Sequence, residues 1–242
     1  MLTKTLAIVL HAMKYGESRL IVDMFTRTHG RLSFIVSIPK SAKAKLKKQY
    51  FQPLTILEVE ADIRPQLQLQ KLREARLAVA TISIASDPGK LAIGFFVAEF
   101  LFHTLRYPGE DAGVFDYVEG AVRWLEERQE GFANFHLVLL IRLSGWLGCR
   151  PNLEGYREGC YFDLREGTFV EQPPLHRDFL MPEDAGKMGL VMRMDFATMH
   201  LFRMSHNERN QLLEVILRYY RIHLPGLPEL KSVEVLMAVF GE

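Results

Sequence analysis

The chain has 242 residues, of which 48% are hydrophobic and 24% are charged, a normal composition for a soluble globular protein of one or two domains. The longest apolar run, residues 91–105, is interrupted by Glu99 and His103, and the N-terminus lacks a signal-peptide pattern. The two cysteines do not make a disulfide framework. We therefore expect a cytosolic protein with no membrane partner. The net charge of +1 hides an asymmetry: residues 1–80 hold 14 Lys and Arg against 6 Asp and Glu, whereas the remainder holds 16 against 23, which indicates that the basic part meets a polyanion.

The first 80 residues have the period of two that is typical of strands. Apolar residues alternate over 5–11 and 20–24, and again over 31–38, after the turn signal His29-Gly30. In this third segment Leu32, Phe34, Val36 and Ile38 share one face. Further strands are predicted over 54–61 and 67–72, with a possible bulge near Lys71.

Five short strands in about 75 residues favour a closed barrel, because an open sheet would leave its edges unpaired. Five is the strand number of the OB-fold, and an SH3-like barrel is the alternative. We therefore predict an α+β protein with a basic OB-fold barrel over 1–80 and a mainly helical domain over 81–242.

After residue 80 the apolar spacing becomes helical. Helices are predicted over 91–105, where Asp87-Pro88-Gly89 is the start signal, and over 114–125 and 137–147. Ser205 and Glu208 form a capping box for a helix to about residue 224, and a short helix covers about 232–240. Residues 148–182 are rich in Pro and Gly and are predicted to be an insertion with a hairpin, 161–163 and 168–170.

The strongest local signal is a lysine-rich segment at the rim of the predicted barrel. It contains Lys40, Lys43, Lys45, Lys47 and Lys48 and no acidic residue. Ammonium groups at this density suit the phosphates of DNA, and a solvated linker is the alternative. The predicted DNA-binding surface adds four cations from the strands: Arg19, Arg31, Lys71 and Arg73.

Base stacking would also need exposed aromatic residues. Tyr15, Tyr50 and Phe51 lie in predicted loops and are candidates, although each could equally plug the end of the barrel. Phe34 is predicted to point inward and is not a candidate.

The motifs of common enzyme classes are absent from the sequence. It has no Walker A or dinucleotide-binding glycine pattern, no H-E-x-x-H and no G-x-S-x-G, and its eight histidines are scattered. Cys149 and Cys160 have no C-x-x-C partners, so two buried thiols are favoured over a metal site. We expect a protein without enzymatic activity and without a cofactor.

A second candidate surface lies on the predicted helix around Arg142. Phe135, Leu139 and Arg142 could form an apolar groove beside a guanidinium group, which suits an acidic, aromatic-rich peptide. An ordinary core helix whose arginine reaches solvent is the alternative that the pattern favours.

The combination of these features resembles the RecO family of bacterial recombination mediators over nearly the whole chain. The resemblance rests on Lys14-Tyr15-Gly16-Glu17-Ser18, His29-Gly30-Arg31-Leu32-Ser33-Phe34, the basic segment, Gln52-Pro53-Leu54, Gly148-Cys149-Arg150-Pro151-Asn152-Leu153 and Leu230-Lys231-Ser232. It implies an OB domain, a helical domain, binding of single- and double-stranded DNA, and annealing of complementary strands. It also implies partnership with RecR, contact with the C-terminal tail of single-strand-binding protein and, indirectly, loading of the RecA recombinase.

One departure concerns zinc. Many members of the family carry two C-x-x-C pairs after the L-G-x-x-P-x-L segment, whereas this chain reads Gly155-Tyr156-Arg157-Glu158-Gly159-Cys160 there. We therefore predict no bound metal. The alternatives to a DNA-binding mediator are a protein–protein adaptor whose barrel binds an acidic partner and an RNA-binding OB-fold protein.

Overall fold

The computed structural model describes residues 2–38, 47–64, 66–105 and 112–239. The chain forms two compact units: unit 1 comprises Met1–Glu127 and Leu230–Val239, and unit 2 comprises Arg128–Glu229. Each unit is described by itself.

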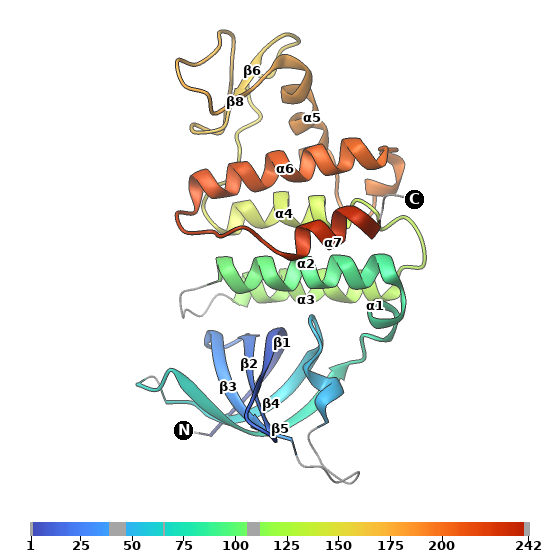
Figure 1. The fold of residues 1–242 in the computed structure, drawn as a ribbon. Helices are drawn as coiled ribbons and strands as arrows, with labels where there is room; N and C mark the ends of the chain where they lie inside the picture. The colour runs from blue at the N-terminus through green and yellow to red at the C-terminus, as the bar shows by residue number, and fades with distance from the viewer. Residues whose placement is uncertain (1, 39–46, 65, 106–111, 240–242) are drawn as a thin grey trace. The chain divides into compact units, whose positions relative to one another are not determined.

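Unit 1 contains a closed five-stranded barrel (Figure 1). Its strands are β1 (Leu2–Tyr15), β2 (Arg19–Thr26), β3 (Gly30–Ser37), β4 (Ile56–Asp62) and β5 (Leu69–Val79), and their order around the barrel is β1-β2-β3-β5-β4. All neighbours are antiparallel except β3 and β5. This architecture confirms the predicted OB-type barrel.

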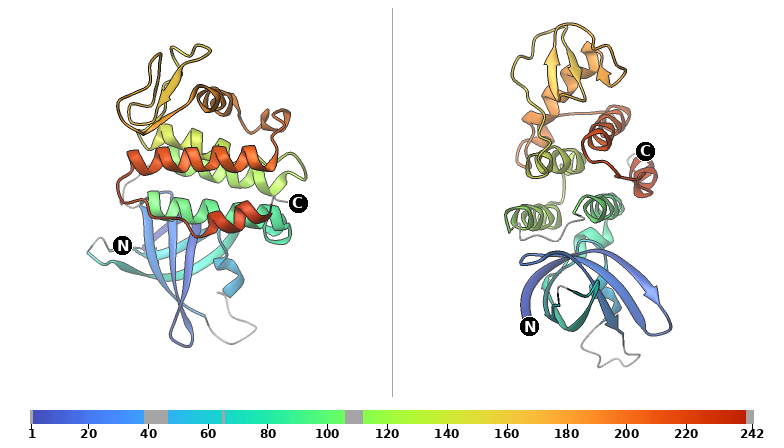
Figure 2. Two further views of the ribbon diagram at one scale, coloured as in Figure 1. Left: turned by 45° about the horizontal axis from the view of Figure 1, so that its top comes forward. Right: turned by 90° about the vertical axis from the view of Figure 1, so that its left-hand side faces the viewer.

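Alternating side chains fill the interior of the barrel. Val22, Phe34 and Val59 are fully buried there, as the period of two requires, while the turn η1 (Lys48–Phe51) adds the buried ring of Phe51. The right-hand view of Figure 2 shows the strands curving around this common interior. The predicted inward face of β3 is confirmed, since Leu32, Phe34, Val36 and Ile38 all contribute to this core.

Two strands carry register shifts that bend the barrel wall. In β1, Val9 pairs with Met24 and His11 with Asp23, so Leu10 is the extra residue. In β5, Leu72 pairs with Ala61 and Glu74 with Glu60, so Arg73 is the extra residue. The irregularity expected near Lys71 is therefore present at Arg73. The strand continues to Val79, seven residues beyond its predicted end.

Four helices complete unit 1: α1 (Ile82–Ser86), α2 (Pro88–Thr104), α3 (Ala112–Glu127) and α7 (Ser232–Val239). The predicted start of α2 is confirmed, because the Asp87 side chain accepts a hydrogen bond from the Lys90 amide. Leu91 and Phe95, which begin the predicted apolar stripe, are among the exposed residues of α2. Because α2 is apolar on nearly every side, the spacing of its apolar residues does not identify one buried face.

Carboxylates from neighbouring helices cap two helix starts of unit 1. Glu99 of α2 accepts hydrogen bonds from the amides of Lys231 and Ser232 at the start of α7. Glu126 of α3 accepts from the amides of Ser83 and Ile84 in α1. These contacts connect segments that are far apart in the sequence.

Unit 2 contains α4 (Phe135–Trp146), a small sheet of β6 (Tyr161–Asp163), β7 (Thr168–Val170) and β8 (Phe179–Leu180), then α5 (Pro182–Arg193), η2 (Met199–Leu201) and α6 (His206–His223). The predicted hairpin and the capping box of Ser205 and Glu208 are confirmed. Helix α5 was not predicted, and it packs beside β6 and β8 (Figure 2). Within the described residues, no helix combines the length and the apolarity that a membrane crossing requires.

The barrel ends at Val79, close to the predicted limit at residue 80. The assignment of 1–80 and 81–242 as separate domains stays a prediction, since unit 1 also takes in α1, α2, α3 and α7.

Candidate nucleic-acid interface

The outer face of strands β1, β2 and β3 is divided into two halves by the helices of unit 1. Residues paired across the strands share a face, so the register arranges the outward side chains in rows. The rows nearest α2 and α3, which contain Phe25, Arg31, His11, Asp23 and Ser33, form what we call the covered half. The two rows farther along form the open face: Met13, Tyr15, Arg19, Ile21, Ile35, Ser37 and Lys71.

Aromatic contacts close the covered half. The rings of Phe25 and Phe115 of α3 lie 5.4 Å apart between centroids. The Arg31 guanidinium lies 4.7 Å from the ring centroid of Phe102 and also donates to the Phe102 carbonyl oxygen. Arg31 is therefore already engaged by α2 and is not grouped with the open cations. Its predicted DNA contact stays a prediction.

A hydrogen-bonded row forms the edge of the covered half next to the open face. Asp23 lies between His11, whose Nδ1 is 3.2 Å from Oδ2, and Ser33, whose hydroxyl donates to Oδ1. The hydrogen bond with Asp23 raises the pKa of His11 despite the opposing effect of burial. Burial alone would raise the pKa of Asp23, but the hydrogen bonds from His11 and Ser33 outweigh it and lower that pKa.

This row is not a catalytic triad. A serine nucleophile needs a histidine beside its hydroxyl group, whereas here the carboxylate of Asp23 lies between the other two residues. The arrangement therefore supports the packing of the sheet under α2 and supplies no activated nucleophile.

The open face presents cationic, aromatic and aliphatic groups together. One row pairs Tyr15 with Arg19 and Arg19 with Ser37. The next pairs Met13 with Ile21, Ile21 with Ile35, and Ile35 with Lys71 of β5. Tyr15 and Met13 are 50% and 49% exposed, so this part of the barrel wall has no cover within the described residues.

Two groups stand out among the cations of the barrel. Arg27, Arg64, Arg76 and Lys4 are paired with Asp116, Asp62, Glu74 and Glu60, respectively. By contrast, five cations of the predicted DNA-binding set are exposed and have no carboxylate partner among the described residues: Arg19, Lys47, Lys48, Lys71 and Arg73. Lys40, Lys43 and Lys45 lie outside the described residues. The structure therefore brings Arg19 and Lys71 onto the open face and places Arg73 two residues beyond Lys71 on β5.

The three aromatic candidates have different positions. Tyr15 is half-exposed on the open face, whereas Phe51 is buried in the barrel core and Tyr50 packs against it. The plug alternative is thus what the structure shows for Phe51. Met13, Ile21 and Ile35 were not predicted as site residues, although their spacing of two from Tyr15, Arg19 and Ser37 places them on the same face.

The predicted partner groove on α4 is not assembled in the described structure of unit 2. Phe135 and Leu139 are both 0% exposed, and the ring of Phe135 stacks on Phe196 at 5.1 Å. Arg142 is exposed and donates to the Met194 carbonyl oxygen at 3.0 Å. This arrangement resembles the core-helix alternative, and a partner role for these three residues stays a prediction.

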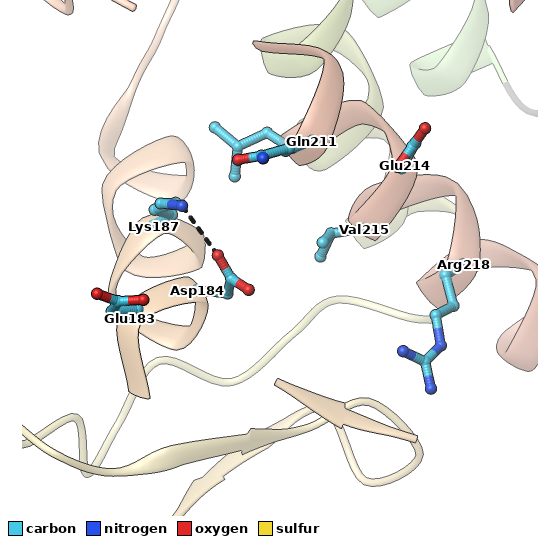
Figure 3. A pocket seen from close by; sticks show the side chains of 8 residues that line it. Glu183, Asp184, Lys187, Gln211, Glu214, Val215 and Arg218 are labelled. Carbon is cyan, nitrogen blue, oxygen red and sulfur yellow. Dashed lines mark hydrogen bonds and ion pairs between the residues drawn. The ribbon is translucent and has the colours of Figure 1, made fainter. Parts of the chain in front are cut away.

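A shallow pocket of about 470 Å³ lies between α5 and α6 (Figure 3). Its charges are largely engaged: Lys187 pairs with Asp184 at 2.9 Å, and Arg218 bonds to Asp178 and to the Arg177 carbonyl oxygen. Glu183, Glu214 and Gln211 add polar groups at its rim. The lining offers neither a nucleophile beside a base nor a consistent charge, so we assign it no ligand.

The two cysteines of unit 2 are both buried. Burial raises the pKa of the Cys149 thiol to about 11, which disfavours the thiolate that a metal requires. Over the described ranges, no three His, Cys, Asp or Glu residues are placed to hold a metal ion. The expectation that this chain binds no zinc stays a prediction.

Comparisons with known proteins match the chain along its whole length. Residues 1–80 match the family model for the N terminus of recombination protein O, and residues 85–234 match that for its C terminus. The chain is 48% identical over 241 residues to the DNA repair protein RecO of Phocaeicola vulgatus, with all of both chains covered. It is 46% identical to that of Bacteroides fragilis, covering 99% of this chain and all of the relative, and 37% identical to that of Porphyromonas gingivalis, covering 97% of each. The chain belongs to the RecO family of recombination proteins.

Proposed function

We propose that this protein acts in DNA repair and recombination as a mediator that binds single- and double-stranded DNA through its barrel and anneals complementary strands. The observation that carries the proposal is the open face of an OB-type barrel, where exposed cations have no carboxylate partner among the residues that the structure describes. Membership of the family supports the biological role, because the relatives are DNA repair proteins.

The expected mode of binding is electrostatic and largely independent of base sequence. Lysine and arginine side chains neutralise phosphates and release their counterions, so affinity falls steeply as salt rises. The cations of the open face are separate, exposed side chains and are not held in a buried arrangement for bidentate contact with a base. Such cations suit contacts with the phosphate backbone more than recognition of base edges.

Annealing follows from the same surface. Two complementary strands repel each other, and a basic surface that neutralises both of them lowers the cost of their encounter. No bond is made or broken in this process, so we propose a role without catalysis. The row of His11, Asp23 and Ser33 agrees with this role because it lacks a serine beside a base.

The test is strand annealing by the purified protein. We expect the variant with Lys43, Lys45, Lys47 and Lys48 all changed to Glu to anneal strands at least tenfold more slowly than the wild type, because the charge of the lysine segment is reversed. The matched control makes the same number of charge reversals at exposed arginines of unit 2: Arg150, Arg193, Arg203 and Arg221. Equal annealing by both variants would remove the lysine segment from the mechanism.

Family membership also supports partners and a location. We propose that the protein works with RecR, contacts the C-terminal tail of single-strand-binding protein, and so assists the loading of RecA in the cytoplasm at the nucleoid. Of the three residues predicted for the tail, Arg142 is the one that a partner can reach without rearrangement of unit 2. An Arg142→Glu variant that binds the tail peptide as tightly as the wild type would exclude this residue.

A further inference from the structure

The open face has a property that phosphate binding alone does not explain. Alongside its cations it exposes the ring of Tyr15 and the thioether of Met13, and it leaves Ile21 and Ile35 only partly buried. Exposed apolar groups next to cations fit a ligand that is itself both apolar and anionic. Unstacked nucleotides have this combination, with flat bases on a charged backbone.

We infer that the open face binds the bases of a single strand, and that Tyr15 is the residue on which a base stacks. This inference rests on the proposed DNA binding and deepens it, because it names the form of DNA that the surface takes and the side chain that distinguishes it.

The fold holds Tyr15 in place. Tyr15 is the last residue of β1, and the chain reverses directly after it at Gly16, whose φ of +69° is accessible to glycine. The Ile38 amide donates to the Ser18 carbonyl oxygen, which ties this turn to the end of β3. A ring presented by a tethered strand end loses little conformational freedom when a base covers it.

The neighbours of Tyr15 complete a binding site for one nucleotide. Arg19 is its partner across the strands, and side chains at such positions start about 5 Å apart, so the guanidinium group can reach the phosphate of a base stacked on the ring. The adjacent row of Met13, Ile21 and Ile35 provides an apolar surface for the next base, and Lys71 of β5 adds a second cation to that row. The row continues to Asp62 of β4, whose carboxylate is paired with Arg64.

The spacing of the rows favours a single strand over a duplex. Neighbouring rows are two residues apart along each strand, or roughly 6.6 Å. Bases stacked in a duplex rise by about 3.4 Å, half of that distance, and their faces are covered by each other. A strand that uses both rows must therefore be extended and unstacked. A duplex can meet the cations but cannot place a base on Tyr15.

The experiment measures fluorescence anisotropy of a labelled oligo-dT strand and of a labelled duplex with the full-length protein. We expect Tyr15→Ala to weaken oligo-dT binding about tenfold, and duplex binding by less than about twofold, since one stacking contact is lost. Tyr15→Phe keeps the ring and should bind both as the wild type does. Tyr156→Ala removes a comparably exposed tyrosine of unit 2 and should change neither affinity.

Salt dependence separates stacking from charge. Tyr15→Ala should leave the slope of log K against log salt unchanged, whereas Arg19→Gln should reduce the slope for oligo-dT by about 0.7. Equal melting temperatures of the variants would show that they are folded. The inference is overturned if Tyr15→Ala binds oligo-dT as the wild type does, or if it loses strand and duplex equally. A wild-type protein that binds neither would overturn the proposed function as well.

Discussion

The two halves of the outer face of β1, β2 and β3 differ in whether their side chains have partners. In the two rows of the covered half, the polar side chains have partners: His11 and Ser33 bond to Asp23, and Arg31 bonds to Phe102. In the open face, Arg19 and Lys71 have no carboxylate partner among the described residues, and Tyr15 remains half-exposed. The same three strands therefore serve packing at one end and present a surface at the other.

This difference shows which side chains of the barrel wall are available for binding a ligand. Polar groups under a helix must be satisfied internally, since an unpaired buried group costs free energy. Side chains beyond the reach of the helices have no such constraint and are available to a ligand. The following predictions test whether the division is real.

The largest expected effect lies in the covered half. Phe25→Ala removes a ring that is 3% exposed and packs on Phe115, so it should lower the free energy of unfolding by about 3–5 kcal/mol. Met13→Ala, on the open face, should lower it by less than about 1 kcal/mol. Urea denaturation measures both. Similar losses from the two changes would contradict the division.

The carboxylate of Glu99 in α2 caps the start of α7. Glu99→Gln should cost about 1 kcal/mol, the usual value of a helix cap. Burial alone would raise the pKa of Glu99, but hydrogen bonds from Ser232 and Lys231 lower it below its ordinary value of 4.5. This contribution is therefore present above pH 4.5 and is lost as the pH falls through the folded-state pKa. Thermal unfolding near pH 7 and in acid should show the two proteins converging; a constant difference would exclude the cap.

The row of His11, Asp23 and Ser33, at the edge of the covered half, should give a smaller effect in the opposite pH direction. The folded-state pKa of His11 is raised above 6.5, so its contribution is complete below pH 6.5 and is lost as the pH rises through the raised value. Because His11 is about half-exposed, the change should be a few tenths of a kcal/mol. His11→Gln should remove that part of the pH dependence of unfolding. An unchanged profile between pH 6 and 8 would show that the pair does not contribute.

The smallest expected effect concerns Arg27. Its guanidinium forms two hydrogen bonds with Asp116, at 2.8 and 3.0 Å, but both side chains are exposed. Arg27→Gln should leave the melting temperature and the affinity for oligo-dT almost unchanged, because exposed ion pairs contribute little and this cation is already neutralised. A clear loss of DNA affinity would mean that paired cations also contact the ligand.

Much of the fold could be predicted from the sequence because local patterns determine it. The alternation in β3, the capping box of α6 and the Asp87 cap of α2 are local patterns that the strand or helix itself needs in order to form. Other elements have no such signal. The bulge at Arg73 interrupts the alternation of β5, α1 has only five residues, and α5 contains Gly186 and Gly189, which are poor helix formers.

The site could be predicted less well because it depends on tertiary contacts. Nothing in the neighbourhood of Arg31 shows that its guanidinium meets Phe102, 71 residues away. The burial of Phe135 and Leu139 could not be predicted either, because α4 is apolar on most sides and its spacing does not identify a buried face. By contrast, Arg19, Lys71 and Tyr15 were found from charge and residue type, although their common face appears only with the strand register.

The most direct test of the account compares cations that have no carboxylate partner among the described residues with paired cations of the same barrel. One variant changes Arg19, Lys71 and Arg73 to Gln, and the matched control changes Arg27, Arg64 and Arg76, which are paired with carboxylates. The measurement is the slope of log K against log salt for oligo-dT. The first variant should lower the slope by about 2, at about 0.7 for each phosphate contact, and the control should leave it unchanged. Equal slopes for the two variants would contradict the claim that the open face is the nucleic-acid interface.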